Sequence, residues 1–199
     1  MGRKSIAPQR QEEILDAFER TIEQHGFSGS STRNIAEAAK MKQAMIAHYF
    51  GSKKELVDAL VRRITDDYVL RMQQALGNTS GDVRVKRLLG FLFGPGLLGN
   101  KTKRNLIGQL LAAAINDETL RAQMHFMYQS FIEIGIRELS QTLPEIPVHK
   151  HKECVYGILC LAVGNDAVLS VDLPYSNRIL ARQCAEVLIN RLRMSLGPH

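Results

Sequence analysis

The chain has 199 residues, enough to bury a real hydrophobic core, and its aliphatic, tryptophan-free composition with only 6% aromatic residues favours helices. Lysine and arginine exceed aspartate and glutamate by 26 to 20, and the resulting formal charge of +6 favours a polyanionic partner without requiring one. The three cysteines lack CxxC spacing, which argues against a disulfide framework. The first residues contain no apolar segment, so no signal peptide is predicted, and no apolar run is long enough to span a bilayer, so no membrane partner is expected. We therefore expect a cytoplasmic protein.

Three helices are predicted at the start of the chain. Over residues 11–25, Ile14, Phe18 and Ile22 recur every four positions, the pattern of an amphipathic helix that Gly26 ends. A short second helix follows in STRNIAEAA, with Ser31 as its N-terminal cap, and a third covers residues 43–50. We expect them to share a small core made of Phe18, Ile22, Phe27, Ile35, Ala39, Ile46 and Phe50.

The fourth helix is predicted to be long. Ser52 and Glu55 have the spacing of a capping box, and the apolar period continues to about Leu76, where GNTSGD interrupts it. Five further helices are predicted over residues 83–93, 103–115, 118–143, 152–171 and 176–196. The predicted fold class is therefore all-α with about nine helices, divided into a domain of residues 1–52 and a larger domain of residues 53–199.

A short turn between the second and third helices gives the layout of a helix-turn-helix, in which the third helix enters the DNA major groove. The charges agree with this layout, because residues 32–54 carry a single acid, Glu37, and five basic residues: Arg33, Lys40, Lys42, Lys53 and Lys54. Basic residues at positions 3, 4 and 10 precede the first helix, on what we expect to be an arm.

The segments STRNIAEAA and HYFGSKKELVDAL, followed by a long connecting helix, resemble the N-terminal domain of the tetracycline-repressor (TetR) family of bacterial regulators. MIAHYFGSK is similar to the branch of that family that contains the choline and glycine-betaine regulators. The resemblance implies an all-helical fold, with a helix-turn-helix domain followed by a larger domain for effector binding and dimerisation. It implies a homodimeric repressor that binds double-stranded operator DNA and is released by a small-molecule effector.

Carried over by position, the resemblance implies that Thr32, Tyr49 and Lys53 bind phosphates, with His48 near the DNA backbone. Arg33, Gln43, Ala44 and Met45 would face base edges, and Lys42 would add charge. The chemistry agrees, because a guanidinium pairs with guanine, a carboxamide with adenine, and apolar groups with a thymine methyl.

The chain departs from the family pattern at three positions. Lys40 occupies a turn position that usually holds glycine, although a lysine disfavours a left-handed backbone. Lys42 replaces a serine or threonine cap, and Ala47 replaces a tyrosine that would donate to a phosphate. The charges of the two lysines would restore the phosphate affinity that these changes remove.

The resemblance also implies that the last two helices pair with their mates in a dimer, because apolar residues run nearly all round the first of them and form a stripe on the second. The candidate interface residues are Val155, Ile158, Leu159, Ala162, Leu180, Cys184, Val187 and Leu188. The alternative for these residues is a core within one chain.

An effector pocket is expected between residues 83 and 143, if the resemblance holds there. Its candidate lining residues are Phe91, Phe93, Leu97, Leu98, Gln109, Met124, Met127, Tyr128 and Phe131. For each of them the alternative is ordinary core.

No catalytic residue, metal site or cofactor is predicted. GPGLLGNKT lacks the lysine of a phosphate-binding loop, and HKHKEC offers His149, His151 and Cys154 as possible metal ligands in a predicted loop. The alternative to a DNA-binding regulator is a helical enzyme or small-ligand carrier whose basic surface has no specific DNA partner. Binding of duplex DNA separates the two.

Overall fold

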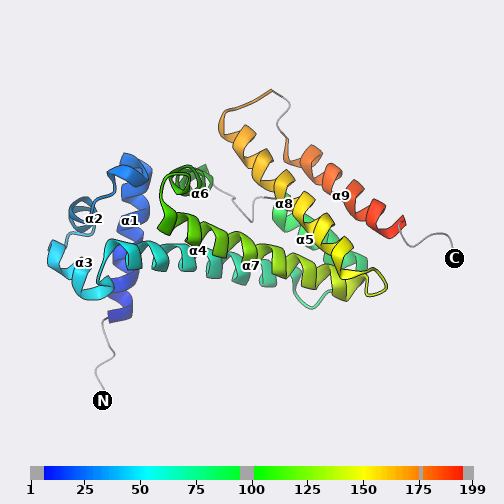
Figure 1. The fold of residues 1–199 in the computed structure, drawn as a ribbon, viewed down its shortest axis with the longest axis horizontal. Coiled ribbons are helices and arrows are strands. Elements are labelled where there is room, and N and C mark those ends of the chain that lie inside the picture. The colour runs from blue at the N-terminus through cyan, green and yellow to red at the C-terminus, as the bar shows by residue number, and fades with distance from the viewer. Residues whose placement is uncertain (1–6, 95–100, 175–176, 195–199) are drawn as a thin grey trace, which may run out of the picture. The chain divides into compact units, whose positions relative to one another are not determined.

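The computed structural model describes residues 7–94, 101–174 and 177–194, and it is all-helical there, without a strand (Figure 1), which confirms the predicted fold class. The basic residues at positions 3 and 4, together with Leu97 and Leu98, lie outside the described residues. The helices are α1 Ala7–Gly29, α2 Thr32–Ala38, α3 Gln43–Phe50, α4 Lys53–Leu76, α5 Gly81–Phe93, α6 Lys101–Ala114, α7 Glu118–Thr142, α8 Val148–Ser170 and α9 Arg178–Met194.

The predicted capping residues begin their helices as expected. The Ser31 hydroxyl accepts a hydrogen bond from the amide of Asn34 at 3.2 Å. At the start of α4 the Ser52 hydroxyl accepts from the Glu55 amide at 3.2 Å, and the Glu55 carboxylate accepts from the Ser52 amide at 2.8 Å, so the capping box is confirmed. Helix α1 continues to Gly29 through a kink at Gly26, whose φ is 73°.

The start of α8 differs from the prediction, because the helix begins at Val148 rather than at residue 152. Polar HKHKE gives no apolar period and was therefore expected to be a loop, but Pro147 stands at the N-terminal cap, where the missing amide of proline costs nothing. His151 is consequently buried, with Nδ1 2.9 Å from the Ser140 hydroxyl, and burial lowers the pKa of its imidazole. The described residues contain no group of three histidine, cysteine or acidic side chains suited to a metal.

The chain forms two compact units, the first comprising Met1–Ile64 and Asn105–Phe126, the second Thr65–Arg104 and Met127–His199. Helices α4, α6 and α7 each contribute residues to both units. The domain boundary predicted after residue 52 stays a prediction.

The core of the first unit joins α1, α2, α3 and the start of α4. Its fully buried apolar side chains include Ile14, Phe18, Ile22, Ile35, Ile46, Leu56 and Leu60. Phe27, Ala39 and Phe50, which were expected in this core, are only half-buried. The short helices α2 and α3 pack against the 23-residue α1, and this tertiary packing stabilises helices too short to persist alone.

The core of the second unit has two clusters. The larger one joins α5, α7, α8 and α9 through residues such as Leu89, Leu139, Ile158 and Ala185. The smaller one contains Tyr68, Met72 and Leu76 of α4, packed with Leu88 and Phe91 of α5 and Ile134 of α7.

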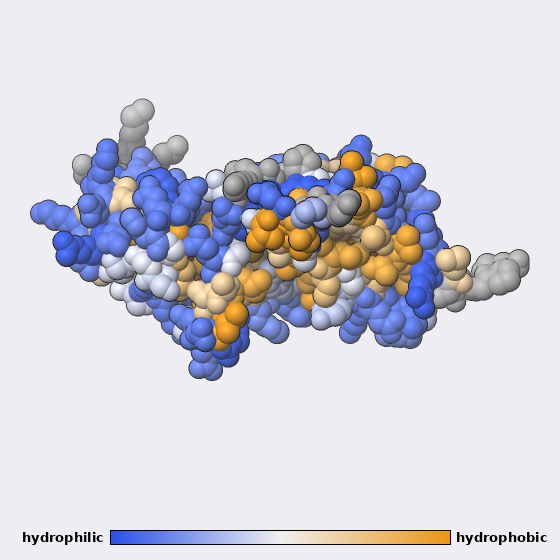
Figure 2. All heavy atoms as spheres, turned by 90° about the horizontal axis from the view of Figure 1, so that it is seen from above, coloured by the Kyte–Doolittle hydropathy of each residue, from blue (hydrophilic) through white to orange (hydrophobic). Residues whose placement is uncertain are grey.

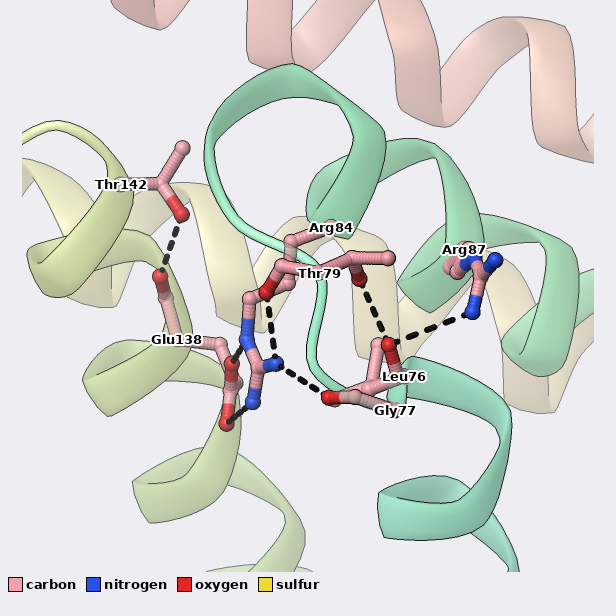
Figure 3. A network of polar contacts seen from close by, with 7 residues as sticks. All are labelled: Leu76, Gly77, Thr79, Arg84, Arg87, Glu138 and Thr142. Carbon is pink, nitrogen blue, oxygen red and sulfur yellow. Dashed lines mark hydrogen bonds and ion pairs between the residues drawn. The ribbon is translucent and has the colours of Figure 1, made fainter.

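A buried ion pair ties the α4–α5 turn to α7 in this unit (Figure 3). Two nitrogens of the Arg84 guanidinium donate to the two carboxylate oxygens of Glu138, one of them at 3.2 Å, and the pairing raises the pKa of Arg84. The same guanidinium donates to the carbonyls of Gly77 and Thr79 at 3.2 and 3.0 Å. The Arg84 side chain therefore bonds to the α4–α5 turn and links this turn to α7.

Helix α8 has the length and composition of a membrane span, with a mean hydropathy of 1.3 in its most apolar window. One such helix is weak evidence for a membrane. In this structure α8 lies along α9, and its buried apolar residues belong to the larger core cluster of the second unit.

Candidate nucleic-acid interface

Helices α1, α2 and α3 pack against one another and form a three-helix head (Figure 1). In α3 only Ile46 is buried, because this eight-residue helix contacts α1 and α2 along one narrow side. Gln43, Ala44 and His48 are exposed, as is Lys42 at the N-terminal cap, while Met45 and Tyr49 are half-buried. Arg33 of α2 is exposed and Thr32 is half-buried. The structure thus leaves most of α3 free to contact a ligand.

The turn between α2 and α3 has the left-handed backbone that favours glycine. Lys40 lies there with a φ of 54°, and its amide donates to the Glu37 carbonyl at 3.0 Å. A non-glycine residue in this region is held at a cost of about 1 kcal/mol or more. The turn therefore has the left-handed backbone although a lysine occupies the position, and Lys40 is strained.

We expect Lys40→Gly to stabilise the protein, because glycine adopts positive φ without a steric penalty. The matched control is Lys40→Ala, which removes the same charge and keeps the strain. Urea unfolding should give Lys40→Gly a free energy of unfolding about 1 kcal/mol above that of Lys40→Ala. Equal stability of the two variants would show that the turn is unstrained.

The cap of α3 is also incomplete. Lys42 has the extended backbone of a cap residue but makes no side-chain hydrogen bond to the first turn. The free amides at this helix start keep their partial positive charge, and the exposed lysine adds a full one. Both features favour an anion near the start of α3.

One hydrogen bond organises the exposed face of the head. The Gln43 carboxamide nitrogen donates to the Thr32 hydroxyl at 2.9 Å, so the start of α3 is linked to the start of α2. Gln43 is thereby held in one orientation by a residue predicted to touch a phosphate. A carboxamide positioned in advance loses less side-chain entropy when it binds a ligand.

The last residues of α3 and the first residue of α4 contact α1. The rings of His48 and Tyr49 pack edge to face with centroids 5.0 Å apart, and the Tyr49 carbonyl accepts from Gln11 of α1 at 3.3 Å. Lys53, the first residue of α4, holds its ammonium 5.1 Å from the centroid of the Phe27 ring. Gly51, with φ 71°, separates the two helices, and a Cβ there would lie 2.4 Å from the Glu55 carboxylate.

The structure adds a polar cluster that the sequence did not predict. Arg63 of α4 pairs with three carboxylates of α1, those of Glu12 at 3.0 Å, Asp16 at 2.7 Å and Glu19 at 2.6 Å. Burial lowers the pKa of Arg63, but its hydrogen bonds to Glu12, Glu19 and Asp16 outweigh burial and raise it. The three acids recur at helical spacing along α1, whereas their shared partner lies 44 to 51 residues away in the sequence. The cluster fixes α4 to the head.

The predicted pocket residues fall into both units. Gln109 and Met124 belong to the first unit, while Phe91, Phe93, Met127, Tyr128 and Phe131 belong to the second. Phe93 lies in the larger core cluster, and Phe91 and Phe131 lie in or against the smaller one. Their role as pocket lining stays a prediction.

The predicted dimer residues divide into buried and exposed sets. Val155, Ile158 and Ala162 are buried in the chain's own core, and Leu159 and Leu188 are half-buried. Leu180 and Val187 are 50% and 64% exposed, and Cys184 is exposed between them. Tyr156 and Cys160 of α8 are exposed as well. Figure 2 shows apolar side chains gathered on the side of the second unit that carries α8 and α9.

Comparison with known proteins matches residues 14–60 to the model of the family described as bacterial regulatory proteins, tetR family. The BetI regulator of Stenotrophomonas maltophilia is 34% identical over 64 residues, which is 32% of this chain and 33% of the relative. The BetI regulator of Escherichia coli O157:H7 is 26% identical over 172 residues and 82% of each chain.

Among solved structures, a transcriptional regulator from Saccharomonospora viridis in complex with choline matches with a TM-score of 0.73. It is 17% identical and the match covers 92% of this chain and 96% of the other. At this identity the likeness concerns the fold.

Proposed function

Because the chain belongs to the TetR family of bacterial regulatory proteins and is similar to its BetI branch, we propose that it is a cytoplasmic, homodimeric transcriptional repressor. Each copy binds half of a double-stranded operator through α3. A small-molecule effector bound by the second unit releases the DNA. The protein has no catalytic role in this proposal.

The exposed, cation-flanked α3 carries the proposal. Lys42 stands at its N-terminal cap, Gln43 is its first residue and is held by the hydrogen bond to Thr32, and Lys53 lies three residues beyond its end. Only one of its side chains is buried. An α-helix of this size fits the major groove, and so few side chains specify only a short half-site. Useful specificity then requires two copies whose recognition helices are about 34 Å apart or a multiple of it.

Release by an effector follows from thermodynamic linkage. A ligand that binds more tightly to a dimer with the wrong spacing lowers DNA affinity, and DNA lowers ligand affinity by the same factor. Choline in the S. viridis structure supports a small-molecule role for this fold in that protein.

The test is fluorescence anisotropy with the duplex that flanks the coding region and with a randomised duplex pool, at two salt concentrations. Saturable binding of two chains to the flanking duplex, well above the pool, is the expected result. Weak and equal binding to both would reject the proposal in favour of an enzyme or carrier with a basic surface.

Two variants separate the predicted roles at α3. Lys53→Ala should weaken binding to all duplexes and lower the salt slope by about 0.9, because one phosphate contact is lost. Gln43→Ala should instead relax preference at one base pair by about 1–3 kcal/mol.

Lys86→Ala is the matched charge control, since Lys86 is exposed on α5 of the second unit. It should leave both the salt slope and the base preference unchanged. Equal losses on every sequence for the Lys53 and Gln43 variants would remove the roles assigned to them.

A further inference from the structure

Two exposed cysteines belong to the paired helices α8 and α9. Cys160 of α8 and Cys184 of α9 are free and exposed, whereas Cys154 is buried in the larger core cluster. An exposed thiol can meet small oxidants, while a thiol buried among apolar groups is inert. Burial also raises the pKa of the Cys154 thiol to about 11, so that almost none of it is thiolate. Two of the three thiols are therefore open to chemical modification.

Two contacts fix the register of α8 against α9. The helices lie side by side and run in opposite directions (Figure 1). Near the end of α8, Asp166 Oδ1 lies 3.7 Å from Nη2 of Arg178, the first residue of α9. Farther along the pair, Gly157 of α8 lies against Leu188 of α9, because a Cβ at Gly157 would be 3.1 Å from Leu188 Cδ1. The pairing therefore extends from residue 166 back to residue 157 on α8 and from residue 178 to residue 188 on α9.

This register places the two exposed cysteines at the same level of the pair. Cys160 lies six residues before Asp166 on α8, and Cys184 lies six residues after Arg178 on α9. Six residues cover about 9 Å of helix axis in each case. Because the helices are antiparallel, equal steps from one contact lead to positions opposite each other.

Both cysteines also lie near the line along which the helices meet. Cys160 is one turn from Gly157, and Cys184 is one turn from Leu188, and residues three or four apart share a helix face. Axes of packed helices are about 8–10 Å apart and Cα atoms lie about 2.3 Å from each axis, so facing Cα atoms are about 3.4–5.4 Å apart. Positions toward the exposed edge are somewhat farther apart. This spacing suits a disulfide, whose Cα atoms are about 4.4–6.8 Å apart.

We propose that Cys160 and Cys184 are a peroxide-sensitive dithiol, which closes to an intrachain disulfide between α8 and α9. One thiolate attacks a peroxide oxygen, the O–O bond breaks, and a sulfenic acid forms while hydroxide leaves and takes up the thiol proton as water. The second thiolate attacks the sulfenic sulfur, so that the S–S bond forms, the S–O bond breaks and a second water is released. The two sulfur atoms together lose two electrons, which hydrogen peroxide takes up in becoming two molecules of water.

Such a disulfide adds a response to oxidants that the proposed function does not contain. Disulfides in the cytosol are mostly transient and redox-sensing. Cys184 lies between Leu180 and Val187 on the predicted dimer face of α9, so oxidation modifies that face. The proposal depends on neither operator nor effector binding, and its failure leaves the proposed function untouched.

The experiment is oxidation of the full-length protein with hydrogen peroxide, followed by thiol alkylation in urea and peptide mapping. The number of alkylated thiols per chain should fall from three to one. Disulfide peptides should join residues 160 and 184 at least ten-fold more often than either is joined to Cys154. Non-reducing gel electrophoresis should show single chains, and dithiothreitol should restore all three thiols. A disulfide-linked dimer, or oxidation to sulfinic acids without a disulfide, overturns the proposal.

Peroxide treatment in urea is the control for proximity. The unfolded chain should lose the preference for the 160–184 disulfide, because closing the shorter loop between residues 154 and 160 costs less entropy. An equal preference in urea and in the native protein would show that the fold does not bring the two thiols together.

Four variants locate the pair. Cys154→Ala should still form the disulfide, whereas Cys160→Ser and Cys184→Ser should each lose it. Because a dimer through α9 would cover Cys184, Val187→Asp is oxidised in parallel. A disulfide in that variant alone supports the pair and assigns its protection to the dimer, and a disulfide in neither protein overturns the proposal.

Discussion

Val187→Asp is expected to make the chain monomeric and to lower its affinity for a two-half-site operator by about 10²–10⁴-fold, the gain that linking two binding modules provides. Val187 is 64% exposed on α9 and continues the apolar face of Leu180 and Cys184 at helical spacing. An aspartate there would lose its hydration in a dimer without gaining a partner. Light scattering after gel filtration measures the mass, and anisotropy with full and half operators measures the affinity.

Val83→Asp is the matched control, because Val83 is equally apolar and exposed on α5. It should change neither the mass nor the operator affinity. The Val187 variant should retain its affinity for a half-site duplex, since the head is untouched. A Val187→Asp protein that remains dimeric would place the interface elsewhere and leave the α8 and α9 assignment without support.

Helical periodicity in the sequence predicts the exposed dimer residues of α9 but not those of α8. On α9 the apolar stripe is separated from polar residues, so its exposed members Leu180, Cys184 and Val187 follow from helical periodicity. On α8 apolar residues run nearly all round, and periodicity gives no direction there. Only packing shows that Val155 and Ile158 face the chain's own core while Tyr156 and Cys160 face outward.

Most of the head was predictable because its signals are local. Capping at Ser31 and Ser52 and the break at Gly51 depend on neighbours within a few residues. Contacts across long sequence separations were not predictable. Arg63 meets its carboxylates, and Arg178 meets Asp166, only once the helices pack, and no periodic pattern distinguishes these residues from ordinary surface charges.

Glu138→Ala is expected to lower the free energy of unfolding by about 3 kcal/mol, the lower part of the range for breaking a buried ion pair. The Glu138 side chain is 9% exposed and that of Arg84 is 22% exposed, so the variant leaves a poorly hydrated guanidinium. The carbonyls of Gly77 and Thr79 still accept from it, which keeps the cost from being larger. Urea unfolding followed by circular dichroism measures the loss.

The double variant Arg84→Met with Glu138→Leu separates the value of the pair from the cost of breaking it. Replacing both partners removes the charge that would be left behind, so its stability should lie within about 1 kcal/mol of the unmodified protein. Completed by the single variants Arg84→Met and Glu138→Leu, the double-mutant cycle should show that the double variant loses much less stability than the two single losses added together. If Glu138→Ala costs less than about 1 kcal/mol, the pair behaves like an exposed one, and the α4–α5 turn owes its position on α7 to the apolar residues around it instead.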